Sequence, residues 1–168
     1  LSGAVYRGLA AWKAAPEQLA VLDCRAFYDL EVFGRNVRLV LPLGSELVQP
    51  VPAGVLLDGR PATVRSIGEA GLELEIAEPG RYRLEVPLHV TPQSASGWSG
   101  FETRIPSLPT ARLEWTVPRD ALAIEVPSAL GRVTFAPEEG RLAAELGPAP
   151  RLAMRWPEGP GRSPGGPL

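Results

Sequence analysis

The sequence predicts an all-β fold, an antiparallel β-sandwich of immunoglobulin-like or related type with at most one or two short helices. Apolar and polar residues alternate with a period of two in many short segments, as they do in half-buried strands. The chain of 168 residues also contains 18 glycines and 19 prolines, which fall between these segments. Few segments show helical periodicity. Many short strands separated by turn residues are typical of two sheets that bury one face each.

A long strand is predicted over residues 22–32 and a second over 37–43, with a turn at Gly34-Arg35-Asn36 between them. One face of the first strand would carry the apolar side chains of Leu22, Cys24, Ala26, Tyr28, Leu30 and Val32. The opposite face would carry the charged side chains of Asp23, Arg25, Asp29 and Glu31. Residues 10–22 are rich in alanine, so a helix is an alternative for that segment.

Two hairpins are expected in the next part of the chain. Residues 72–76 and 80–90 both alternate, and Pro79-Gly80 before the second run suits a type II turn. Asp58-Gly59 is a dipeptide that favours a two-residue hairpin turn. Residues 55–90 are therefore predicted to form a meander.

The remaining strands are expected between closely spaced prolines. They are predicted over residues 101–105, 111–117, 122–126, 132–135 and 151–156. Residues 141–146 suit either a short helix or a strand. Residues 91–100 are rich in Ser and Gly and form either a hairpin loop, which we favour, or a boundary between two smaller sheets.

The chain is expected to form a single β-sandwich domain over residues 1–157. Two small β-domains, over 1–92 and 100–157, are the alternative. Residues 158–168 are rich in Pro and Gly and are predicted to be a linker or tail. Because the chain has neither an initiating Met nor a signal-peptide pattern at Leu1, we expect it to be part of a longer protein.

Composition excludes several classes of protein. The net charge is −2, and arginines and glutamates are interspersed, so a nucleic-acid-binding surface is not expected. No apolar run approaches the roughly 20 residues of a transmembrane helix. Cys24 is the only cysteine, so an internal disulfide is impossible and the redox compartment stays open.

The order of turn and strand motifs resembles that of uncharacterised β-domains in large bacterial cell-envelope proteins of planctomycete type. The motifs are Tyr6-Arg7-Gly8, Leu41-Pro42-Leu43, Asp58 to Ala62, Pro79 to Tyr82, Ile105 to Pro109, Leu146 to Pro148, and Leu152 to Trp156. The resemblance implies an extracytoplasmic domain of a multidomain protein, in the periplasm or at the cell surface. It implies no catalytic residue, and a cytoplasmic location stays open.

No catalytic residue is predicted. Nucleophilic catalysis needs a base beside the nucleophile, and the only imidazole, His89, falls on the polar face of a predicted strand. Cys24 falls among core positions, where a thiol behaves as a small hydrophobic group. The chain is therefore not expected to be an enzyme or to hold a cofactor.

No metal site is predicted either. Zinc sites need two or more His or Cys ligands at short spacing, which the sequence lacks. Asp23, Asp29 and Glu31 are the nearest approach to a calcium ligand set, but their alternation indicates an exposed strand face. Glu73 and Glu75 share a face and are interpreted as surface charge rather than as a glycosidase pair.

The tryptophans suggest one candidate binding residue. Trp115 and Trp156 alternate in phase with apolar neighbours and are predicted to lie in the core. Trp98 lies among Ser and Gly residues, and its indole is expected to cover one end of the sandwich. The alternatives are a stacking platform for a sugar, with Tyr6 or Tyr28 as a second aromatic residue, or an anchor in a protein interface.

Three hypotheses follow for the function. The first is a non-catalytic structural or protein-interaction domain of a larger bacterial envelope protein, with other domains of the parent chain or envelope proteins as partners. The second is a carbohydrate-binding module that uses Trp98 to bind polysaccharide. The third is an accessory domain of an enzyme whose active site lies outside this chain.

Overall fold

The computed structural model describes residues 1–14, 17–121 and 123–158, and almost every regular element in them is a β-strand. The strands are β1 (Gly3–Ala14), β2 (Glu17–Val32), β3 (Val37–Leu41), β4 (Val48–Pro50), β5 (Leu56–Leu57), β6 (Arg60–Pro61), β7 (Val64–Ser66), β8 (Leu72–Ile76), β9 (Gly80–Val90), β10 (Gln93–Ala95), β11 (Trp98–Arg104), β12 (Ala111–Thr116), β13 (Val133–Ala136), β14 (Arg141–Glu145) and β15 (Arg151–Pro157). Two single-turn 3-10 helices, η1 (Pro52–Gly54) and η2 (Gly68–Ala70), interrupt them. The all-β prediction is confirmed.

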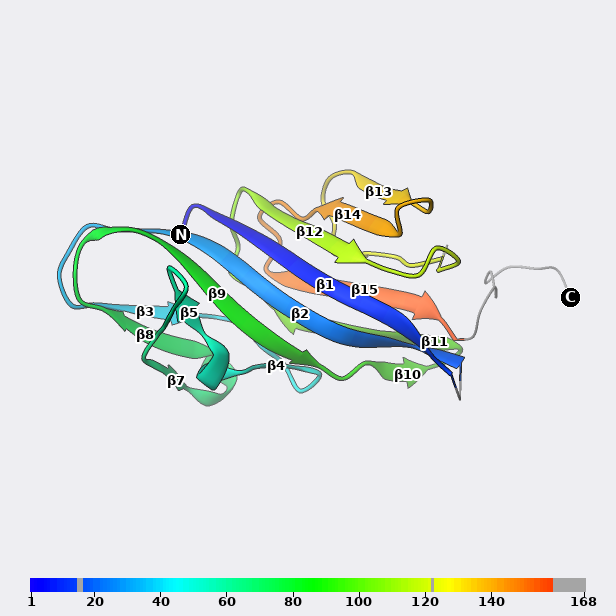
Figure 1. Cartoon of the computed structure of the whole chain (residues 1–168), viewed down its shortest axis with the longest axis horizontal. Coiled ribbons are helices and arrows are strands. Elements are labelled where there is room, and N and C mark those ends of the chain that lie inside the picture. The colour runs from blue at the N-terminus through cyan, green and yellow to red at the C-terminus, as the bar shows by residue number, and fades with distance from the viewer. Residues whose placement is uncertain (15–16, 122, 159–168) are drawn as a thin grey trace, which may run out of the picture.

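The strands form one large sheet and two small ones. The large sheet has the order β13-β14-β12-β1-β2-β9-β5-β6, with β4 also paired to β9. The small sheets have the orders β10-β11-β15 and β3-β8-β7. Figure 1 shows β1, β2 and β9 running the length of the molecule, with the two small sheets toward opposite ends of these strands. Buried side chains from all three sheets form one hydrophobic cluster, as a sandwich-type fold requires.

Aromatic side chains occupy the centre of this cluster. Tyr6 and Tyr28 meet edge to face at 6.0 Å between ring centroids. Trp115 stacks on Phe101 at 5.8 Å, and Trp156 meets Phe101 at 6.4 Å. Both tryptophans are almost fully buried, so their prediction as core residues is confirmed.

The sequence predicted antiparallel strand pairing throughout, but one pair of strands in the structure is parallel. β1 pairs with β12 in parallel, and this pairing places Gly8 opposite Trp115. The two strands lie about a hundred residues apart in the sequence, so the long intervening chain can return in either direction. The fold is therefore a mixed sheet with mainly antiparallel neighbours.

The predicted hairpin between residues 72–76 and 80–90 does not exist. β8 pairs with β3 and β7 in a small sheet, whereas β9 pairs with β2 in the large sheet. Pro79-Gly80 therefore carries the chain from one sheet to the other. β9 aligns with β2 over eight residue pairs, from Arg25↔Pro87 to Val32↔Gly80, which is a longer ladder than five-residue β8 offers. The predicted meander over residues 55–90 is wrong for the same reason.

Two other turns agree with the sequence. Asp58 and Gly59, with φ angles of 49° and 74°, form the two-residue turn between β5 and β6. Ser96 and Gly97, with φ angles of 54° and 80°, form a similar turn between β10 and β11. Residues 93–100 thus form a hairpin of their own, and the chain passes from the large sheet to the small sheet β10-β11-β15 between Val90 and Gln93. The segment over 91–100 therefore contains both a hairpin and a boundary between sheets, and Trp98 begins a strand instead of lying in a loop.

A β-bulge alters the predicted face of the long second strand. The register of β1 against β2 shifts between Leu9, which faces Asp23, and Ala10, which faces Val21. Leu22 is the additional residue, and its side chain is 61% exposed instead of buried. The other five positions of the predicted apolar face, Cys24, Ala26, Tyr28, Leu30 and Val32, are buried as predicted.

The segments for which the sequence allowed a helix or a strand are strands in the structure. Residues 10–22 belong to β1 and β2 in their described part, so the helical alternative is wrong, and residues 141–146 contain strand β14. The strand predicted over 122–126 is reduced to one bridge, between Glu125 and Arg155, and residue 122 itself lies outside the described part.

The division of the chain into one domain over 1–157, or two over 1–92 and 100–157, stays a prediction. The linker or tail predicted over 158–168 lies outside the described residues except for Glu158. In the described part of the chain, no helix is long and apolar enough to cross a membrane.

Candidate functional site

Trp98, the one residue singled out from the sequence for binding, lies at the start of β11 on the outward face of its small sheet. The Arg155 guanidinium carbon lies 4.9 Å from the centroid of the Trp98 ring. Glu125 holds this arginine, with its Oε2 2.6 Å from Arg155 Nε and two backbone hydrogen bonds between the same residues. One side of the indole is therefore already in contact with a fixed cation. Trp98 is half-buried rather than a free platform.

The close approach of β11 to β15 depends on Gly100. Gly100 lies opposite Arg155 in the ladder, and a Cβ atom at Gly100 would lie 2.3 Å from the carbonyl oxygen of Met154. Beside it, the hydroxyl groups of Ser94 and Ser99 form a hydrogen bond of 2.7 Å between β10 and β11. The sheet is thus tightly joined at the end that carries Trp98.

The same outward face continues along β11 with charged residues. Glu102 Oε1 accepts a hydrogen bond of 2.6 Å from Arg151 on β15. Arg104, two residues further along β11, lies opposite Arg151 in the register. Because alternate residues of a strand share a face, Trp98, Glu102 and Arg104 form one continuous surface.

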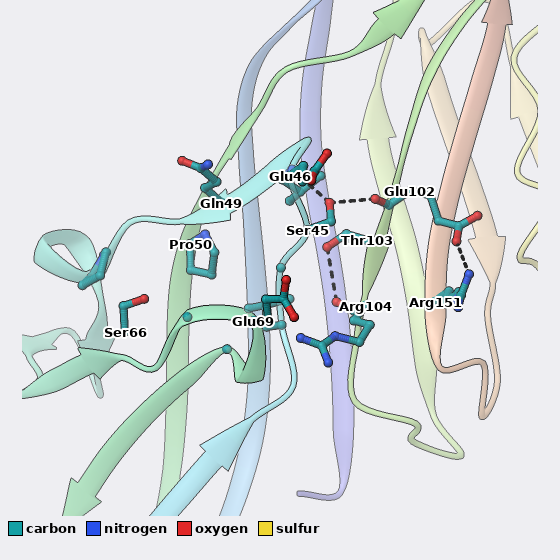
Figure 2. Close-up of a pocket in the computed structure, with 16 residues that line it drawn as sticks. Ser45, Glu46, Gln49, Pro50, Ser66, Glu69, Glu102, Thr103, Arg104 and Arg151 are labelled. Carbon is teal, nitrogen blue, oxygen red and sulfur yellow. Dashed lines mark hydrogen bonds and ion pairs between the residues drawn. The ribbon is translucent and has the colours of Figure 1, made fainter.

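This surface ends in a groove between β11 and the other small sheet. The groove has a volume of about 660 Å³ and is open to solvent on one side. Its polar walls come from four separate parts of the chain, and Figure 2 labels their side chains. They comprise Ser45, Glu46, Gln49, Ser66, Glu69, Glu102, Thr103, Arg104 and Arg151.

Local backbone structure holds the groove in shape. The hydroxyl group of Ser45 donates a hydrogen bond of 2.8 Å to the carbonyl oxygen of Glu102 and accepts one of 3.1 Å from the Val48 amide. Gly44 and Gly71 on its rim have φ angles of 125° and 111°, which residues with a side chain rarely adopt. A Cβ atom on Gly71 would also lie 2.0 Å from the carbonyl oxygen of Leu41. These contacts fix the backbone around the groove.

Three charged residues of the groove are not paired within the described chain. On the large sheet, Arg7 pairs with Glu114 on the neighbouring strand, and Arg83 pairs with Asp29. In contrast, Glu46, Glu69 and Arg104 have no ion-pair partner among the residues that the structure describes. The groove thus combines charges of both signs that are not neutralised within the described chain.

The structure removes the aromatic partners proposed for Trp98 in sugar binding. Tyr6 and Tyr28 are both 0% exposed, and their hydroxyl groups lie 3.4 Å apart in the core. Burial raises the pKa of both phenols above the usual value. Neither tyrosine reaches a ligand, so a platform built from Trp98 with one of them is excluded.

The two residues tested for catalysis, Cys24 on β2 and His89 on β9, differ in burial: one is buried and the other is exposed. Cys24 is buried, and desolvation, with a smaller contribution from the charge of Asp23, raises its pKa to about 12. His89 is exposed on β9, where it lies opposite Gln49 of β4. The Cys24 thiol and the His89 imidazole therefore do not form a nucleophile–base pair.

The acidic residues tested as ligands form ion pairs instead. Asp23 pairs with Arg25, Asp29 with Arg83, and Glu31 with Arg81. Glu73 pairs with Arg65 and Arg38, while Glu75 also pairs with Arg38. In the described ranges, no group of three or more His, Cys, Asp or Glu side chains is placed to hold a metal ion.

Sequence reasoning missed the groove. Its charged residues, Glu46, Glu69 and Arg104, come from segments about 20 to 35 residues apart, and none belongs to a recognisable motif. The isolated glycines Gly44 and Gly71 were the only local signal, because glycine outside a tight turn often marks a close backbone approach.

Comparison with known proteins identifies the fold but no family. No family model and no curated protein matches this sequence. Two solved structures of the M1 zinc metallopeptidase from Deinococcus radiodurans are similar to this chain: the enzyme itself, with a TM-score of 0.55 at 15% identity, and a mutant bound to a Tyr-Ser-Ala substrate, with a TM-score of 0.53 at 16% identity. Yeast LTA4 hydrolase gives a TM-score of 0.47 at 11% identity, over 92% of this chain and 28% of its own.

The matches cover most of this chain but only part of the other proteins. Each Deinococcus structure covers 93% of this chain, whereas this chain covers only 41% or 42% of theirs. This chain therefore has the fold of a part of those proteins and spans less than half of their length.

Proposed function

We propose that this chain is a non-catalytic accessory domain of a larger enzyme, whose active site lies outside the 168 residues. The observation that carries this proposal is the unequal match: nearly the whole of this chain resembles less than half of a zinc metallopeptidase. Of the two residues tested for catalysis, Cys24 is buried in the core and His89 is exposed to solvent.

The similarity also favours this role over a purely structural envelope domain. A location in the bacterial envelope and a partner among envelope proteins stay predictions from the sequence. A domain of this kind would contribute a rigid surface to the enzyme rather than chemistry. By analogy of fold, the proposed reaction of the complete protein is zinc-dependent hydrolysis of peptides.

The test compares this chain with the complete polypeptide encoded by its gene. Zinc content is measured by mass spectrometry, and hydrolysis is measured with aminoacyl-coumarin and tripeptide substrates. We expect the complete polypeptide to hold one zinc ion and to release product, while the 168-residue chain holds none and hydrolyses nothing above buffer. Hydrolysis by this chain alone, or a complete polypeptide with no hydrolytic domain, would contradict the proposal.

A further inference from the structure

We propose that the groove between β11 and η2 receives a loop of the adjoining domain, and that this loop carries a carboxylate for Arg104 and a basic side chain for Glu69. The inference rests on the proposed accessory role and adds the surface and the chemistry of the contact. Both residues line the groove, and they come from different elements, Arg104 from β11 and Glu69 from η2.

Charge complementarity is the first argument. Eleven arginines in the described chain form ion pairs with carboxylates of this chain, and on β11 and β15 Arg151 and Arg155 do so. Arg104, on the same face, has no such partner among the described residues, and the same holds for Glu46 and Glu69. A guanidinium group matches the geometry of a carboxylate, so a partner with an Asp or Glu side chain fits Arg104.

The character of the groove favours a protein segment over a small metabolite. Sites for small molecules usually enclose most of the ligand. This groove is open to solvent, and its lining combines charged and hydroxyl side chains with the apolar side chains of Leu43, Val48, Pro50 and Pro52, a mixture that suits a protein segment. The groove is also continuous with the outward face that carries Trp98, so a partner can extend beyond it.

Rigidity is the third argument. The hydrogen bonds of Ser45 tie the segment around Val48 to β11, and Gly71 packs closely against the backbone of Leu41. A preformed surface loses little conformational entropy on binding, which favours docking of one defined loop.

The test measures the melting temperature of two variants, each in this chain alone and in the complete polypeptide. Arg104→Gln removes the unpaired charge in the groove. Arg81→Gln is the matched control, because Arg81 is an exposed arginine of β9 that pairs with Glu31 at 3.4 Å. We expect R104Q to leave the melting temperature of the isolated chain within about 1 °C of wild type and to lower that of the complete polypeptide by about 3 °C or more. R81Q should change both by the same small amount.

An equal effect of R104Q in both contexts would overturn the inference. If the complete polypeptide is an active hydrolase in that case, the accessory role stands and only the docking surface is wrong. A further arm adds glycylglycine to the isolated chain as a small zwitterionic probe. Stabilisation by this dipeptide that is lost in R104Q would mean that the groove is a small-molecule site, which also overturns the inference.

Discussion

Gly8 lies beneath the indole of Trp115, and the packing of the core at this point depends on the missing side chain. A Cβ atom on Gly8 would lie 2.2 Å from Cε2 of Trp115. We expect Gly8→Ala to lower the free energy of unfolding by about 1–3 kcal/mol, because a buried ring packed on both sides cannot move without strain. Urea denaturation followed by tryptophan fluorescence measures the change.

Gly34→Ala is the matched control for this prediction. Gly34 also lies in the first part of the chain, but a Cβ atom there would make only an ordinary contact of 3.5 Å with Val37. The free energy of unfolding of Gly34→Ala should stay within about 0.5 kcal/mol of wild type. Equal stability of the two variants would mean that Trp115 does not lie against β1.

Trp115 itself supports a second prediction. Its Nε1 is buried and has no hydrogen-bond partner among the described atoms, so the indole contributes through packing alone. Trp115→Ala should therefore cost about 3–5 kcal/mol, as expected for a large core truncation. Trp115→Phe should cost clearly less, because it keeps most of the ring and removes an unsatisfied polar group. Equal losses in the two variants, measured by urea denaturation, would contradict this account.

Cys24 is expected to be chemically inert in the folded chain. Its pKa of about 12 leaves very little thiolate at pH 8, and the side chain is buried. Reaction with Ellman's reagent should be at least about 100-fold slower in the native chain than in guanidinium chloride. Because the folded pKa lies above the unfolded value, the protonated thiol stabilises the fold fully below about pH 8.5, and this contribution is lost as the pH rises toward 12. Rapid labelling of the native chain at pH 8 would show that Cys24 is not in the core.

At the scale of the element, the bulge in β2 makes Leu22 dispensable. Its side chain is 61% exposed, so Leu22→Ser should change the free energy of unfolding by no more than about 0.5 kcal/mol. Leu30→Ala, on the same strand but in the core, should cost about 2–5 kcal/mol. A large loss for Leu22→Ser in urea denaturation would mean that the alternation predicted from sequence continues without a bulge.

Strands were easier to predict than their partners. Alternation identified most of β2, β8, β9 and β11, because burial of one face leaves a period of two in the sequence. It could not show that β8 and β9 belong to different sheets, since each alternating strand fits against any other. The bulge at Leu22 was also hidden, because one additional residue leaves no compositional signal.

At the scale of the whole molecule, the sequence pointed to one candidate binding residue, Trp98, but not to the groove. Trp98 was found because a tryptophan among Ser and Gly residues is unusual. The groove was not found, because Glu69 and Arg104 line the same groove only when two small sheets pack beside the same large one. Spatial proximity of residues that lie far apart in the chain has no signature in a single sequence.

The proposed docking of this domain on the rest of a larger enzyme, through β11, β15 and the groove, should protect backbone amides from exchange. Hydrogen–deuterium exchange is compared between this chain alone and the complete polypeptide. We expect amides of residues 98–104 and of the segment around Ser45 to exchange at least about tenfold more slowly in the complete polypeptide, while those of edge strand β13 are unchanged. Identical exchange rates at these sites in the two proteins would mean that the domain does not dock through this surface.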